Sequence, residues 1–161
     1  MKKTAQLSDC QTYRYNLFRI ADNNRPAKIV TFIGLNPSTA DAFHDDPTIR
    51  RCLGFMTAWG YNSLCMVNLF AYRATVPTDM KQSTDPIGPD NDKTILSCIE
   101  QSDLVVAAWG NHGSFLDRDE QVLSMINKPI YCLGRNASGT PKHPLYIKKD
   151  KTLELLKDAT A

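Results

Sequence analysis

The stretch KIVTFIGLNPSTADAFHDDPTIRR, residues 28–51, sets the fold class of this chain. Its first part, residues 28–34, is an almost continuous apolar run that ends in glycine. Such a run is typical of a β-strand that is covered on both faces. Its last part begins with Asp46-Pro47, an N-cap followed by a first-turn proline, and continues with apolar residues at helical spacing. A buried strand, a loop and an amphipathic helix in succession predict an α/β protein.

The same alternation continues along the rest of the chain. Regular alternation of buried strands and amphipathic helices predicts a parallel sheet with right-handed crossovers. We expect four such strands and one extra strand near the N-terminus. The further strands are predicted at residues 63–70, 103–110 and 129–134 and the extra strand at 12–20, and the further helices at residues 90–102, 116–128 and 149–159.

The composition is that of a soluble protein with a single domain, which we expect to span residues 1–161. Hydrophobic residues make up 42% and charged residues 22%, which argues against disorder, and the net charge of +2 favours no class of partner. The N-terminus lacks the apolar core of a secretory signal, and no apolar run approaches the roughly 18 residues of a membrane-spanning helix. The five cysteines lack metal-ligand spacing, and four lie among apolar residues. We therefore expect a cytoplasmic protein without disulfides, cofactor or membrane contact.

Polar residues follow three of the four predicted parallel strands. Asn36 lies in the loop after the first strand, Asn68 ends the second, and His143 lies in the loop after the fourth. The loop after the third strand, residues 109–113, resembles an ordinary glycine-bounded turn. Each of the three side chains also has a simple structural explanation, as a turn former, a loop partner or a surface histidine. Ligands bind at the carboxyl ends of parallel strands, so we expect the three side chains to share one pocket.

These side chains suit a reaction at a nucleobase. A carboxamide offers a donor and an acceptor side by side, which matches the amide edge of a base such as uracil, and Asn68 is placed for this task. A second carboxamide, Asn36, can hold a water against an electrophilic carbon. A neutral His143 can donate a hydrogen bond to the charge that develops on a leaving base. Phe43 or Tyr146 can supply an aromatic stacking face.

An acidic group in the first loop supports a weaker alternative. Asp41, His44, Asp45 and Asp46 could bind a divalent ion, which would make the chain a metal-dependent hydrolase. Asp46 is also expected to cap the helix, however, and one local cluster rarely encloses a metal without more distant ligands. We therefore assign no metal ligands. Glycine-rich phosphate loops and the nucleophile-elbow pattern are not found in the sequence, which disfavours nucleotide kinases, dehydrogenases and serine hydrolases.

Several long motifs together resemble a bacterial and phage family that is known mainly as a domain of unknown function. The resemblance extends from about Tyr13 to the last predicted helix, which is nearly the whole chain. It does not by itself supply an activity. The motifs are FIGLNPSTAD (32–41), DDPTIRRC (45–52), NLFAYRAT (68–75) and PKHPLY (141–146).

More distantly, the layout resembles the uracil-DNA glycosylase superfamily. That resemblance implies a three-layer α/β/α fold with a four-stranded parallel sheet between helices. Some members carry Gly-x-Asn-Pro-Gly after the first strand, and residues 34–38 follow this motif except at Ser38. His143-Pro144 corresponds to the start of their second motif, often His-Pro-Ser-Pro, and Leu145-Tyr146 replaces its Ser-Pro. Ser38 stands where the family has the glycine that lets the backbone approach closely, and the change at Leu145-Tyr146 bears on how duplex DNA would be bound.

The resemblance also implies roles for individual residues. Asn36 would position the attacking water, Asn68 would read the base and His143 would stabilise the leaving base. Leu145 or Tyr146 would fall where members insert a wedge into DNA. The remaining residues assigned by this resemblance are Gly34, Leu35, Pro37 and Ser38 on the substrate, and Lys148, Lys149 and Lys151 on phosphates.

The sequence therefore predicts an N-glycosidic bond hydrolase that acts on a base in nucleic acid or in a nucleotide. Chemistry on a base in a duplex requires that the base leave the stack. The alternative is a non-catalytic module that binds nucleic acid or a nucleotide in the same cleft. Its expected partners are the same.

Overall fold

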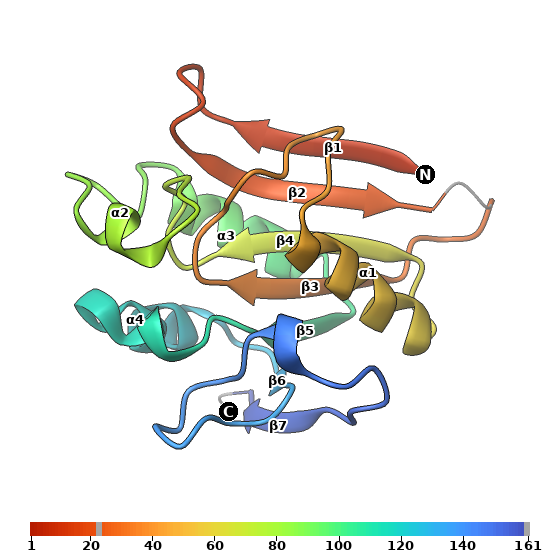
Figure 1. Ribbon diagram of the computed structural model, residues 1–161. Coiled ribbons are helices and arrows are strands. Elements are labelled where there is room, and N and C mark those ends of the chain that lie inside the picture. Colours follow the sequence, from red (N-terminus) through yellow and green to blue (C-terminus); the bar gives the residue numbers. More distant parts are fainter. Residues whose placement is uncertain (22–23, 160–161) are drawn as a thin grey trace.

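A computed structural model describes residues 1–21 and 24–159 of the chain. These residues form a mixed α/β structure in which seven strands make one mixed sheet and four α-helices pack beside it (Figure 1). The strand order is β1-β2-β4-β3-β5-β6-β7. The strands are β1 (Lys2–Leu7), β2 (Arg14–Ile20), β3 (Ile29–Gly34), β4 (Ser63–Asn68), β5 (Leu104–Ala107), β6 (Ile130–Cys132) and β7 (Glu154–Lys157).

The centre of the sheet consists of β4, β3, β5 and β6, which pair with one another in parallel. All residues of β4 are buried, and β3 is buried from its second residue onward, as their apolar sequences predict. Gly34 and Asn68, the last residues of β3 and β4, are direct partners in the register. The predicted loops after these two strands therefore begin side by side at one edge of the sheet.

The sheet is wider than the sequence predicted. The N-terminal region supplies two strands: β1 pairs antiparallel with β2, which pairs antiparallel with β4. The predicted helix over residues 149–159 is wrong, because this segment contains β7, which pairs antiparallel with β6. Leu153 and Leu156 pack against buried clusters on opposite faces of the sheet. A helix docked on one face would not place both side chains in this way.

Three predicted helices are confirmed. Asp46 caps α1, since its Oδ1 accepts a hydrogen bond of 2.9 Å from the Ile49 N–H, and Pro47 is the first helical residue. The short α2 was not predicted, because five residues are too few to show a periodic pattern. In the part of the chain that the structure describes, no helix has both the length and the apolar character for crossing a membrane. The helices are α1 (Pro47–Ala58), α2 (Pro77–Lys81), α3 (Asn91–Glu100) and α4 (Arg118–Met125), with two 3₁₀ turns, η1 (Asn111–Asp117) and η2 (Pro144–Tyr146).

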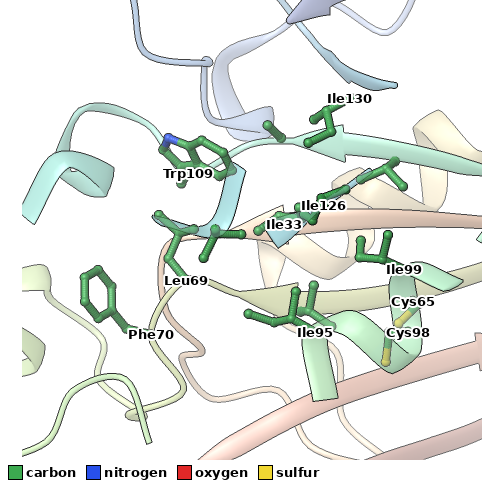
Figure 2. Close-up of a cluster of buried hydrophobic side chains, with 14 of the residues drawn as sticks. Ile33, Cys65, Leu69, Phe70, Ile95, Cys98, Ile99, Trp109, Ile126 and Ile130 are labelled. Atoms are coloured by element: carbon green, nitrogen blue, oxygen red, sulfur yellow. The ribbon is translucent and has the colours of Figure 1, made fainter. Parts of the chain in front are cut away.

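The core lies on both faces of the sheet. Alternate residues of β3 point to opposite faces: Phe32 packs in a cluster with residues of α1, and Ile33 packs with residues of α3. Figure 2 shows the second cluster, in which Ile33, Ile95 and Ile99 lie near Cys65 and Cys98. Helices therefore cover both faces of the sheet, and its edge at the ends of β3 and β4 remains for the loops.

The cysteines follow the prediction. Four of the five are buried free thiols and only Cys10 is exposed. Burial raises the pKa of the Cys52 thiol well above its ordinary value, so that this thiol stays protonated and unreactive.

Candidate functional site

The loops at the carboxyl ends of β3, β4, β5 and β6 enclose a cavity of about 780 Å³. Small-molecule sites are typically clefts of ~300–1,000 Å³ at this edge of a parallel sheet. The arrows of β3 and β4 in Figure 1 point to this edge, and β2 runs the other way. The cavity brings together most of the residues predicted for the site from three separate loops. These are Gly34, Leu35, Asn36, Pro37, Ser38, Asn68, His143 and Tyr146.

Asn36 joins two of the loops and presents one free acceptor. Its Nδ2 donates to the carbonyl of Ala74 at 2.9 Å and to that of Pro37 at 3.2 Å, and lies 3.5 Å from the carbonyl of Tyr72. Three carbonyls around one amide atom identify it as the nitrogen and direct Oδ1 away from them. Among the described residues none donates a hydrogen bond to this oxygen. Since Asn36 lines the cavity, its Oδ1 is available to a water or a ligand.

Asn68 is the most unusual polar side chain of the site. It is only 2% exposed, it lines the cavity, and its buried Nδ2 has no hydrogen-bond partner among the described residues. An unpaired buried donor costs about 1–3 kcal/mol, which a ligand carbonyl would recover.

A glycine is required at position 34 because the Asn68 side chain packs directly against it. A Cβ atom on Gly34 would lie 2.7 Å from the Asn68 Oδ1. The glycine therefore lets the Asn68 amide lie directly against β3, and the sequence signal for this was the glycine that ends the apolar run.

His143 is held in one neutral tautomer. It precedes the η2 turn, and its Nδ1 accepts a hydrogen bond of 3.3 Å from the Leu145 N–H. Burial lowers the pKa of His143 below its ordinary value, so that the imidazole is neutral at pH 7. Because Nδ1 accepts, the proton lies on Nε2. The cavity thus receives a neutral imidazole whose Nε2–H can donate.

The loop after β5, predicted to be an ordinary turn, also lines the cavity. It contributes Trp109, Gly110, Asn111 and His112, and the buried indole Nε1 of Trp109 finds no hydrogen-bond partner in the described structure. A Cβ on Gly113 would lie 2.6 Å from that nitrogen, so this glycine admits the indole. The sequence signal for this role of Trp109 was the pair of glycines that follow it, Gly110 and Gly113, but these glycines also fit a simple turn.

Arg14 is a further cavity residue that sequence reasoning missed. It is the first residue of β2, and it reaches the cavity only because β2 runs antiparallel to β4. Nothing in the local sequence distinguishes it from a strand residue.

Some predicted residues lie outside the cavity wall. Phe43 is 75% exposed and does not line the cavity, whereas Tyr146 lines it and is 88% exposed. The predicted phosphate-contacting lysines do not line it either. Lys151 pairs with Glu154 at 2.8 Å, and Lys149 lies beside Gly54 of α1. Lys148, the third of these lysines, also lies outside the cavity wall.

The acidic residues of the first loop are each engaged separately. Asp41 accepts hydrogen bonds from the N–H groups of Phe43 and His44, which lower the pKa of Asp41 to about 2. Asp45 pairs with the buried Arg19 at 2.8 Å, and Asp46 caps α1. Over residues 1–21 and 24–159, no three His, Cys, Asp or Glu side chains are grouped to hold a metal ion. The metal-dependent alternative therefore has no ligand geometry in the described chain.

Comparison with protein families gives one match. The model of a family described as "Protein of unknown function (DUF1643)" matches residues 14–145, which include every residue of the cavity discussed above except Tyr146. This confirms the predicted membership of an uncharacterised family. No curated protein and no solved structure matches the chain. The bacterial or phage origin and the glycosylase resemblance stay predictions.

Proposed function

Since the chain belongs to DUF1643, a family of proteins of unknown function, we propose its activity from its own cavity. It is an N-glycosidic bond hydrolase that acts on a base in a nucleotide or in nucleic acid. One observation carries this proposal: a free carboxamide oxygen from the loop after β3, an amide donor at the end of β4 that is unpaired among the described residues, and an imidazole N–H from the loop after β6 line one cavity. They belong to Asn36, Asn68 and His143.

In the proposed reaction, each group has one task. The Asn68 Nδ2 donates to a carbonyl of the base and holds it in the cavity. The Asn36 Oδ1 accepts a hydrogen bond from a water and directs its oxygen to the sugar carbon. The bond between that carbon and the base nitrogen breaks, and its electron pair leaves with the base. The His143 Nε2–H donates to the oxygen on which the negative charge develops. The water adds its hydroxyl to the sugar, and its remaining proton ends on the released base.

The fold is consistent with this proposal. The four parallel strands have helices on both faces, and Gly34, Asn36 and Pro37 keep their places in the glycosylase motif. We propose that this part of the molecule is a three-layer glycosylase-like sheet to which three antiparallel strands have been added. The buried free thiols support a reducing, cytoplasmic location.

The second candidate is a module that binds the same ligand without hydrolysis. It is favoured by the three carbonyls around the Asn36 Nδ2, which give this residue a structural role that needs no reaction. The two candidates differ in whether a base is released from a bound ligand.

A base-release assay tests the proposal. Nucleotides and single- and double-stranded oligonucleotides with uracil, mismatched or modified bases are incubated with the wild type and with Asn36→Ala. Oligonucleotides are then treated with alkali to reveal abasic sites, and free base is measured for nucleotides. We expect release by the wild type and a loss of about 100-fold or more in Asn36→Ala, as for other groups that act at the reacting centre.

Asn16→Ala is the matched control. Asn16 hydrogen-bonds Gln6 on the neighbouring strand and does not line the cavity, so its variant should keep full activity. Binding by Asn36→Ala without turnover supports the hydrolase. Binding without release by the folded wild type, on every substrate, would favour the binding module instead.

A further inference from the structure

Arg14 is a buried cation at the wall of the cavity, and within residues 1–21 and 24–159 it has no ionic partner. It is 2% exposed, and among the described residues no carboxylate lies within 4.0 Å of its guanidinium nitrogens. Its Nη1 donates to the carbonyl of Ala40 at 3.0 Å, and its buried Nε has no hydrogen-bond partner in the part of the chain that the structure describes. Burying a charge in this state is costly unless the charge is paired and hydrogen-bonded.

Two other buried arginines show how this protein normally compensates such a charge. Arg19 and Arg118 are both 0% exposed. Arg19 pairs with Asp45 at 2.8 Å, and Arg118 pairs with Asp92 at 2.5 Å and also donates to the carbonyl of Leu69. Of these three arginines, the one that lacks an acidic partner is the one that faces the cavity.

The surroundings of Arg14 keep it charged. Burial lowers the pKa of Arg14 to about 10, which still leaves the guanidinium protonated at neutral pH. Asp46 and Asp41 favour the charged form from a distance, and Arg73 and Arg19 oppose it. The Asp46 carboxylate already caps α1. An anion that enters the cavity would therefore meet a fixed, uncommitted donor.

A second arginine with an unsatisfied donor lies close by. Arg73 lines an adjoining cavity of about 670 Å³, and its buried Nε likewise has no partner among the residues that the structure describes. The two cavities share Ser38, Thr39, Ala74 and Thr75 in their walls. Besides Arg14, the described residues in the wall of the main cavity include Lys142 and one carboxylate, Asp46. This balance favours an anionic ligand.

We propose that Arg14 binds a phosphate group of the ligand, so that the cavity accepts a phosphorylated nucleoside and discriminates against a free base or nucleoside. The guanidinium fork suits a phosphate, to which it can donate two parallel hydrogen bonds. The placement of the base against Asn68 rests on the proposed function, but the phosphate site does not. A free nucleotide and a nucleic-acid strand both carry this group.

Calorimetric titration tests the proposal. The wild type is titrated with uridine, uridine 5′-monophosphate, the corresponding cytidine and purine pairs, an oligonucleotide and inorganic phosphate. We expect the monophosphate to bind about ten-fold or more tightly than its nucleoside, as for a charge-assisted hydrogen bond. Arg14→Met removes this preference and Arg14→Lys reduces it. Arg50→Met, which removes an exposed α1 arginine bonded to the Asp45 carbonyl, keeps the preference.

If Arg14→Met does not fold, nuclear magnetic resonance of the wild type provides a second test of the phosphate site. The Arg14 Nε–H signal, assigned through Arg14→Lys, should shift with phosphate and with the nucleotide. Equal binding of nucleoside and nucleotide, a preference that survives Arg14→Met, or an unshifted signal overturns the proposal.

The failure of this inference is distinguishable from that of the proposed function. Nucleosides that bind without a phosphate preference refute only the phosphate site. Phosphate that shifts the Arg14 signal, with nucleotides binding no more tightly than inorganic phosphate, supports this site and contradicts the base-binding role of Asn68. Tighter binding of the monophosphate than of the oligonucleotide indicates that the phosphate group belongs to a free nucleotide. Tighter binding of the oligonucleotide indicates that it belongs to a nucleic-acid strand.

Discussion

At the scale of single residues, His143 joins local structure to chemistry. Its Nδ1 accepts from the Leu145 N–H, and only the neutral ring can do so. The same hydrogen bond that begins the η2 turn therefore fixes the proton on Nε2, where a leaving base would need it.

This arrangement predicts a pH-dependent stability. Burial lowers the pKa of His143 in the folded state, so between this pKa and the ordinary value of about 6.5 the unfolded chain binds more protons. The stability that neutral His143 contributes is present above pH ~6.5 and is lost as the pH falls below that value. Urea unfolding at several pH values should show a steeper loss for the wild type than for His143→Gln. If the stabilities of the two proteins depend on pH in the same way, burial of a neutral His143 is wrong.

Gly34 gives a steric prediction. An alanine here would place its Cβ 2.7 Å from the Asn68 Oδ1 and 2.9 Å from the Met66 Cε. We expect Gly34→Ala to displace the Asn68 amide and to destabilise the fold by about 1–3 kcal/mol, measured by urea unfolding.

Gly54→Ala is the matched control for this prediction. Its Cβ would meet only the flexible Lys149 side chain, at 3.3 Å, within helix α1. There alanine should be neutral or stabilise the fold by about 0.5–1 kcal/mol. Equal stability of Gly34→Ala and Gly54→Ala would contradict the close approach of the Asn68 side chain to Gly34.

Sequence reasoning found some site residues and missed others for a physical reason. Asn36, Asn68 and His143 were recognisable because each follows a buried apolar run, and parallel strands end at a common edge. Arg14 reaches the cavity from an antiparallel neighbouring strand, and this tertiary relation has no local sequence pattern. Trp109 is admitted by Gly113, which follows it closely in the chain, but Gly110 and Gly113 fit a simple turn equally well.

At the scale of elements, helix α1 anchors the long loop after β3. The Asp46 side chain accepts from the Ile49 N–H at 2.9 Å and is 8% exposed. The loop that carries Asn36 therefore ends at a defined point beside the cavity.

Loss of this cap has a predictable cost. Asp46→Ala should lower the free energy of unfolding by about 1 kcal/mol, within the ~0.5–2 kcal/mol known for such caps. Asp46→Asn keeps the accepting oxygen and should lose less. Equal losses in chemical denaturation would show that the charge near Arg14, and not the cap, is what matters.

The elements were predicted unequally well. The parallel strands and three helices follow from apolar runs, caps and helical spacing. The segment that contains β7 carries a short leucine pattern that fits a helix or a strand, and the available edge of β6 decides between them. In the same way, β1 is a strand because β2 offers it a partner, and its own sequence has little apolar character.

At the scale of the whole molecule, folding divides the cysteines into two classes. Four are buried, and Cys10 is exposed, where hydrogen bonds with Thr12 and Ser8 lower the pKa of its thiol to about 7. Iodoacetamide should therefore modify native protein once, at Cys10, with a rate that rises around pH 7. Mass spectrometry locates the label. Labelling of a second cysteine without denaturant would contradict the burial of the other four.

At the same scale, Asn36, Asn68 and His143 lie far apart in the sequence and line one cavity. Side-chain amide and imidazole resonances of labelled protein, recorded while nucleotides are added, test whether one ligand contacts all three. We predict that one ligand shifts the signals of Asn36, Asn68 and His143 together, with a common binding constant. A ligand that binds at saturation and leaves these three signals unchanged would contradict the account.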